Sequence, residues 1–135
     1  NVMGALLAAG DIHAVMGDGE VATCGAEVAG EIRLRADVIR ADVPMPCVET
    51  ADHLHFIGAG KSLDECEAIV IAKAHHYLTA VVKMSPNEAV RMMSLVGNLR
   101  VCQVVNPLKT MRFSLPKSLA EAYAPGSTTF RSIPS

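Results

Sequence analysis

Polar and apolar residues alternate without a break over residues 31–38, which read EIRLRADV. A period of two is typical of a strand with one face toward a core and the other toward water. Residues 21–28 lie just before it, across Ala29-Gly30, and carry Glu20 at their entrance. The pattern therefore predicts two paired antiparallel strands near the start of the chain.

Two helices are predicted in the middle of the chain. Ser62 and Glu65 have the spacing of a capping box, and an apolar stripe then continues at helical intervals, so a helix is expected over 62–83. Ser85 and Glu88 repeat the box with Pro86 at the first helical position, which predicts a second helix over 86–97. Shorter apolar runs predict strands at 53–57, 99–105 and 111–115.

This order of elements predicts an α+β fold, mainly β with packed helices. Half of the 135 residues are hydrophobic, which is enough for one domain with its own core. We expect that domain to cover residues 1–119 and the tail at 120–135 to be poorly ordered. No apolar run has membrane-spanning length, and a net charge of −2 gives no reason to expect binding to nucleic acid or to a membrane. The four cysteines have no Cys-x-x-Cys spacing and are interpreted as reduced core thiols.

The densest cluster of ionisable residues is at 10–20, which read GDIHAVMGDGE. Asp11 and His13 are two residues apart, as are Asp18 and Glu20, so each pair would project from one face of an extended segment. Carboxylates and an imidazole are ligands for a divalent cation, and a further carboxylate can serve as a general base. The alternative interpretation is a glycine-rich turn whose acids accept hydrogen bonds from backbone amides.

The chain resembles the acetamidase/formamidase family. Residues 4–21, GALLAAGDIHAVMGDGEV, look like the signature block of that family, and residues 95–110, LVGNLRVCQVVNPLKT, are similar to a segment near its carboxyl end. Asp52-His53 and Ile57-Gly58 resemble the strand that leads to its main helix. The likeness runs in order to about Pro116.

The resemblance implies a β-sandwich with helices at its side and the cleavage of a small aliphatic amide to a carboxylate and ammonia. Family members are roughly twice this length, so this chain is expected to be the carboxyl-terminal half of a cytoplasmic enzyme. Its expected partners are a small amide substrate, the missing amino-terminal half of the same protein, and further copies in a homo-oligomer.

The residue chemistry then suggests roles within a metal-assisted amidohydrolase. Asp11 and His13 would hold a divalent metal ion, zinc or calcium. Glu20 would act as the general base and Asp18 would orient a ligand or the amide. One alternative is an inert β-rich fragment that needs its other half.

A phosphate- or nucleotide-binding module that uses residues 58–62 is a more distant alternative. This segment, GAGKS, mimics a phosphate-binding loop, but the first glycine of that motif would fall at His55.

Overall fold

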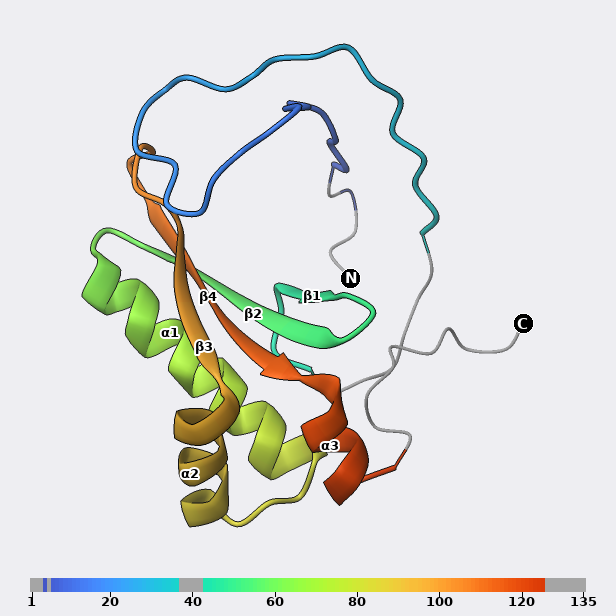
Figure 1. Ribbon diagram of the computed structural model, residues 1–135, viewed down its shortest axis with the longest axis vertical. Coiled ribbons are helices and arrows are strands. Elements are labelled where there is room, and N and C mark those ends of the chain that lie inside the picture. Colours follow the sequence, from blue (N-terminus) through green and yellow to red (C-terminus); the bar gives the residue numbers. More distant parts are fainter. Residues whose placement is uncertain (1–3, 5, 37–42, 126–135) are drawn as a thin grey trace.

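The computed structural model describes residues 4, 6–36 and 43–125 (Figure 1). A four-stranded antiparallel sheet with the order β1-β2-β4-β3 forms its centre. In chain order the elements are β1 (Cys47–Glu49), β2 (His53–Gly60), α1 (Leu63–His76), a π-helical turn η1 (Tyr77–Val81), α2 (Pro86–Val96), β3 (Asn98–Gln103), β4 (Lys109–Pro116) and α3 (Lys117–Tyr123). The predicted α+β class and the two predicted helices are confirmed.

Both predicted helix caps are present. The Ser62 side chain accepts a hydrogen bond from the backbone N–H of Glu65, at 3.2 Å. At α2, Ser85 accepts from the N–H of Glu88 while the Glu88 carboxylate accepts from the N–H of Ser85, so the box is reciprocal. These bonds satisfy amides that the first helical turn leaves without partners.

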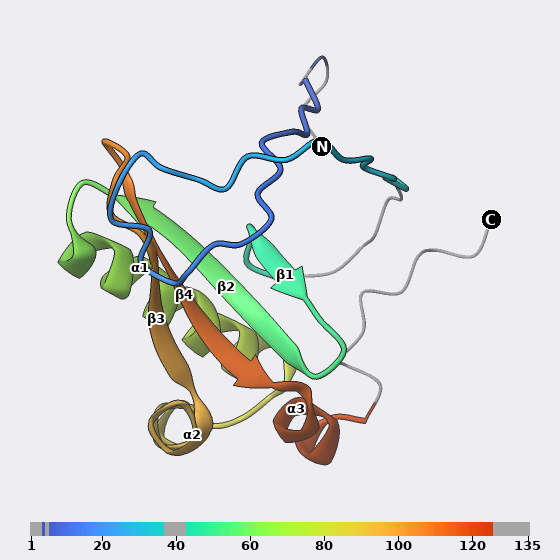
Figure 2. The same ribbon diagram turned by 45° about the horizontal axis from the view of Figure 1, so that its top comes forward.

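The core lies between α1 and one face of the sheet. Alternate residues of β2 and β4 point to that face, and Phe56, with no exposed area, packs against the Tyr77 ring with centroids 5.3 Å apart. Figures 1 and 2 show α1 and α2 on the same side of the sheet. The buried cluster comprises Leu54, Phe56, Val70, Ala74, Tyr77, Leu78, Val82, Met84, Ala89, Met93, Phe113, Leu115 and Ala120. Within the described residues the opposite face carries no helix, and it keeps the polar members of the same alternation.

Close packing explains the glycines of the segment that mimics a phosphate-binding loop. Gly58 belongs to β2, and a Cβ atom there would lie 2.8 Å from Val70 and 2.9 Å from Ile69 of α1. Gly60 is the last residue of β2, and its Cβ atom would meet the Glu65 side chain. The capping bonds at Ser62 complete a structural explanation of this segment.

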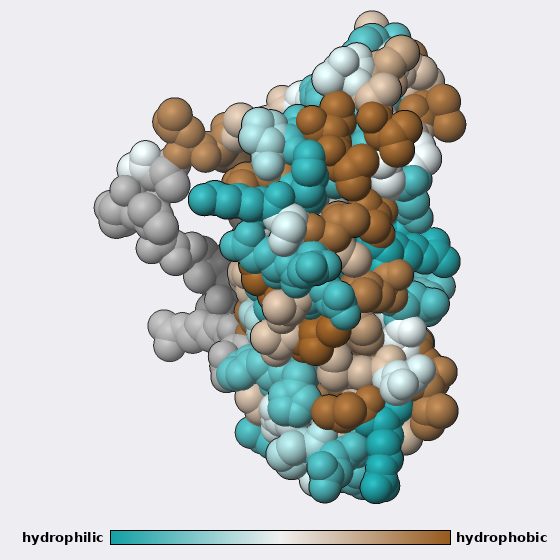
Figure 3. Space-filling model, turned by 90° about the vertical axis from the view of Figure 1, so that its left-hand side faces the viewer, coloured by the Kyte–Doolittle hydropathy of each residue, from teal (hydrophilic) through white to brown (hydrophobic). Residues whose placement is uncertain are grey.

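A shallow apolar groove of about 440 Å³ lies between α1 and α2 and reaches Phe113 of β4. Its lining includes Ile71, Val90, Met93 and Phe113. Figure 3 shows that side of the molecule, where hydrophobic residues form separate patches among hydrophilic ones. No helix within the described residues is long and apolar enough to cross a membrane.

The two strands predicted near the start of the chain are wrong within the described residues. Residues 31–36 are all exposed and lie in no strand, and residues 21–28 contribute only a bridge at Glu27. An alternating pattern becomes a strand only where a partner edge and an apolar surface are available, and neither lies beside residues 31–36. The second sheet of a sandwich is thus not formed by the part of the chain described here, and residues 37–38 lie outside it.

The carboxyl end begins as a helix, whereas the sequence predicts a poorly ordered tail from residue 120. Helix α3 begins directly after β4 and continues to Tyr123, and Ala120 is buried in the core cluster. The backbone N–H of Lys117 donates to the carbonyl of Asp52, which fastens the start of α3 to the loop between β1 and β2. The part of the predicted tail at 120–123 is therefore helical, and residues 126–135 lie outside the described residues.

Candidate functional site

The segment before β1 folds back on itself at residues 12–14 and 26–28. The N–H of Ala14 donates to the carbonyl of Ala26 at 2.8 Å, and the N–H of Val28 donates to the carbonyl of Ile12 at 3.1 Å. His13 and Glu27 face each other in the antiparallel bridge that results. This pairing brings together side chains that are 14 residues apart in the sequence.

Two carboxylates converge on the His13 ring. Its Nε2 atom lies 2.9 Å from Glu27 Oε1 and 3.1 Å from Asp11 Oδ1. Burial alone would lower the pKa of His13, but the charges of Glu27 and Asp11 raise that pKa above its usual value. The His13 side chain is 16% exposed, whereas both carboxylates face solvent. The cluster is therefore open on one side.

Backbone features allow this approach. Asp11 has a φ of 59°, in the left-handed region that Asp tolerates better than most residues. Gly25 lies under the imidazole, where an added Cβ atom would be 2.5 Å from His13 Nε2. A side chain at position 25 would displace the ring, so glycine is required there by space.

The donor set of this cluster is suited to a cation. Asp11, His13 and Glu27 each offer one ligand atom, and these atoms lie within 4.8 Å of one another. Imidazole nitrogen and carboxylate oxygen are both ligands that zinc accepts, and a zinc site with three protein ligands leaves a further position open to water or substrate. Calcium prefers oxygen ligands throughout, so the imidazole favours zinc between the two ions expected from the sequence.

Asp18 lies apart from this cluster, over the helix-free face of the sheet. Its carboxylate pairs with the Arg112 guanidinium in a two-pronged contact, with both N–O distances at 2.8 Å. Arg100 approaches the same carboxylate at 3.4 Å. The hydrogen bonds from Arg112 hold the pKa of Asp18 below its ordinary value, so this side chain is charged at neutral pH.

Backbone hydrogen bonds to the end of β3 fix the position of Glu20. The Glu20 carbonyl accepts from the N–H of Val104, and the N–H of Gly19 donates to the carbonyl of Cys102, so the loop is joined to the end of β3. Among the described residues, the three-donor group around His13 includes Glu27 and not Glu20. The structure thus brings Asp11 and His13 together and connects Asp18 and Glu20 to the sheet instead.

Glu27 is the residue that sequence reasoning missed. It was included in a strand expected to pair with residues 31–38, whereas the observed partner is the segment around His13. The sequence does contain a signal, since Glu27 is an acidic residue in a segment close to His13. It points to Glu27 only if the segment around residue 27 is paired with the segment around residue 13.

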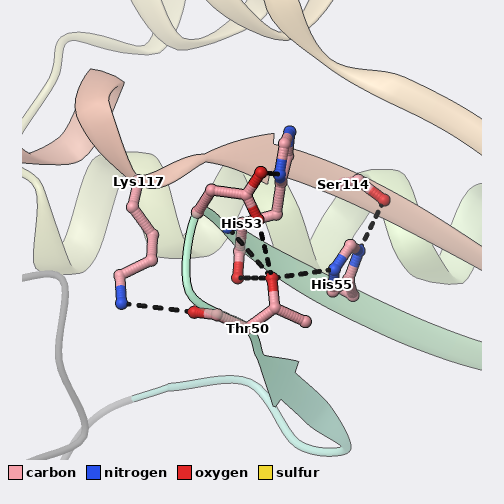
Figure 4. A network of polar contacts seen from close by, with 6 residues as sticks. Thr50, His53, His55, Ser114 and Lys117 are labelled. Carbon is pink, nitrogen blue, oxygen red and sulfur yellow. Dashed lines mark hydrogen bonds and ion pairs between the residues drawn. The ribbon is translucent and has the colours of Figure 1, made fainter.

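A polar network lies next to Arg112 on the helix-free face (Figure 4). His55 Nδ1 lies 2.8 Å from Ser114 Oγ across the β2–β4 pair, and the His55 and His53 rings stack with centroids 5.8 Å apart. Thr50 donates to Asp52, which pairs with His53 at 3.1 Å. Burial and then the charge of Arg112 lower the pKa of His55, so its ring is neutral at pH 7.

The comparisons with known proteins confirm the resemblance that the sequence predicts. The model of the acetamidase/formamidase family matches residues 1–51, which include the whole Asp11–His13–Glu27 cluster as well as Asp18 and Glu20. No curated protein sequence matches the chain.

Solved structures of this kind are also similar in fold. An acetamidase from Bacillus halodurans is 33% identical, with a TM-score of 0.59, over 61% of this chain and 28% of its own. A predicted acetamidase/formamidase from Thermoanaerobacter tengcongensis is 32% identical, with a TM-score of 0.54, over 58% of this chain and 26% of its own. An acetamidase from Yersinia enterocolitica, at 24% identity and a TM-score of 0.53, shares the fold. The chain thus spans less than a third of the length of these proteins.

Proposed function

We propose that this chain carries the metal-holding part of an amidohydrolase that cleaves a small aliphatic amide, of the acetamide or formamide type, to a carboxylate and ammonia. The observation that carries the proposal is the convergence of Asp11 and Glu27 on His13. The family match over residues 1–51 and the likeness to solved acetamidases support the same chemistry.

The roles follow from the donor atoms. Asp11, His13 and Glu27 would hold a zinc ion, which supplies Lewis acidity toward a carbonyl oxygen or a water molecule. Glu20 remains the proposed general base, because its carboxylate is not one of the three ligand donors and so stays available to accept a proton. Asp18 has a positioning role, because its contact with Arg112 holds the loop that carries Asp18 over the sheet.

Backbone hydrogen bonds support the geometry of the cluster. The two hydrogen bonds that pair 12–14 with 26–28 determine the distance between the His13 and Glu27 side chains. Gly25 then leaves room for the imidazole to lie flat against the opposite segment. The pairing of these two extended segments therefore positions the donor atoms of the cluster.

The test separates ligands from base in the natural protein that contains this sequence. His13→Ala and Glu27→Gln should each lose bound zinc and, with it, the release of ammonia from acetamide or formamide. Glu20→Gln keeps the shape of the side chain but cannot accept a proton, so turnover should fall roughly 10²-fold or more with zinc content unchanged.

Glu31→Gln is the matched control, since Glu31 lies in the same segment and pairs only with Arg33 among the described residues. It should change neither zinc content nor turnover. Full zinc content in both His13→Ala and Glu27→Gln would refute the metal site. Unchanged turnover in Glu20→Gln would refute the role of Glu20.

A further inference from the structure

The helix-free face of the sheet carries two polar rows set by strand register. His55, Ser114 and Asn98 are direct partners across β2, β4 and β3 and form the first row. Two residues further along the strands, Arg112 and Arg100 are direct partners and form the second. Because side chains alternate along a strand, both rows project from the same face.

The arginine row has an unbalanced charge. Like charges directly opposite each other on neighbouring strands destabilise the pair unless an anion lies between them. The Asp18 carboxylate supplies one negative charge to two guanidinium groups, and it is close to Arg112 but at 3.4 Å from Arg100. Asp18 therefore balances one of the two charges, and Arg100, which contacts it through one nitrogen at 3.4 Å, keeps further N–H donors that Asp18 does not use.

A cavity of about 200 Å³ opens between the two rows. Its lining residues are His53, His55, Asn98, Arg100, Arg112 and Ser114. Ser114 is only 5% exposed, and its hydroxyl contacts the His55 ring at the floor of the cavity. A water molecule takes up about 30 Å³ of liquid, so the space is that of a ligand with a few non-hydrogen atoms.

We propose that this cavity binds a small monocarboxylate between Arg100 and the His55–Ser114–Asn98 row. The choice of ligand rests on the function proposed above, since amide cleavage produces such a carboxylate. The Asp18 carboxylate already occupies the Arg112 side of the same row, which shows the geometry in which a carboxylate meets these guanidinium groups.

Charge and size decide between a carboxylate and other oxyanions. A monoanion suits the two arginines better than a phosphate dianion, because a dianion would add two negative charges between Asp18 and Asp52, the carboxylate that pairs with His53 at 3.1 Å. The planar guanidinium of Arg100 offers paired donors with the spacing of two carboxylate oxygens. A hydroxyl, an amide and two imidazoles complete a rim of groups that can donate to the second oxygen.

The experiment is a titration of the 135-residue chain with sodium acetate, followed by NMR on the imidazole signals of His53 and His55. EDTA is present, so the result does not depend on the zinc site, and ionic strength is held constant with chloride. Saturable shifts are expected, and Arg100→Ala should weaken acetate binding about tenfold or more, since a hydrogen bond to a charged group is lost. Asn98→Ala should weaken it less.

Arg91→Ala is the control, because Arg91 is an exposed arginine of α2, on the other side of the sheet. It should bind acetate like the unmodified chain. Shifts that do not saturate, equal affinity in Arg100→Ala, or tighter binding of phosphate than of acetate would each overturn the proposal. If the chain binds acetate as expected but the natural protein that contains it releases no ammonia from acetamide or formamide, the result counts against the proposed function alone.

Discussion

The two parts of the described chain are stabilised in opposite ways. Residues 43–125 contain every buried side chain, packed between α1 and the sheet. Residues 6–36 contain none, and a few backbone hydrogen bonds and the Asp18–Arg112 pair hold them. The family model matches residues 1–51 and so includes the whole part without a core, whereas the likeness to solved acetamidases extends over 61% and 58% of the chain and so includes packed elements as well. The difference teaches that the ligand-bearing segment is similar to the family without the support of a core of its own.

This division has a physical basis. A cluster such as Asp11, His13 and Glu27 needs solvent access on one side and donor atoms free of competing bonds, which a close-packed core does not provide. The sheet in turn offers edges and a polar face to which the segment can be joined, at Cys102, Val104 and Arg112. Substitutions in the two parts should therefore have separable consequences.

The largest effect on stability is expected at Phe56. Phe56→Ala removes a fully buried ring that packs on Tyr77, so the free energy of unfolding should fall by about 3–5 kcal/mol. Urea unfolding followed by circular dichroism measures it. Leu95→Ala, at a side chain that is 74% exposed, should stay within about 0.5 kcal/mol of the unmodified chain. Similar losses in the two variants would contradict the position of the core.

The sequence predicted the elements of residues 43–125 well and those of residues 6–36 poorly, because local sequence specifies local interactions better than long-range pairing. Ser62 and Ser85 predicted their helices because a cap is a local interaction between residues three apart. The alternation at 31–38 failed because a strand depends on a partner that local sequence does not specify. Asp11 and His13 were found as neighbours, whereas Glu27 joined them only through long-range pairing.

A smaller and different effect is expected at Gly25. In Gly25→Ala the new Cβ atom would displace the His13 ring, so on the proposed function zinc affinity should fall roughly 10- to 100-fold while the urea midpoint stays unchanged. Competition with a fluorescent chelator measures that affinity. Gly10→Ala is the matched control, since nothing lies within 4 Å of a Cβ atom at Gly10. Equal zinc affinity in the two variants would show that the ring does not need this space.

The smallest effect concerns the junction between the two parts, at Asp18. Because the folded pKa of Asp18 lies below the ordinary value of 3.8, the ionised carboxylate stabilises the junction above that pH, and the contribution is lost as pH falls through the lowered folded pKa.

Asp18→Asn removes the charge at every pH. The backbone amides of Gly19 and Val104 form hydrogen bonds across the junction. In the Asp18→Asn variant at neutral pH, the hydrogens of these two amides should exchange with solvent faster than in the unmodified chain, while that of the Phe56 amide keeps its rate. Hydrogen exchange followed by NMR measures all three. An ion pair whose carboxylate side chain is 47% exposed contributes little to global stability, so the urea midpoint should barely move. Unchanged exchange at Gly19 and Val104 would mean that the backbone bonds alone hold the segment to β3, and acceleration at Phe56 as well would mean that the two parts unfold together.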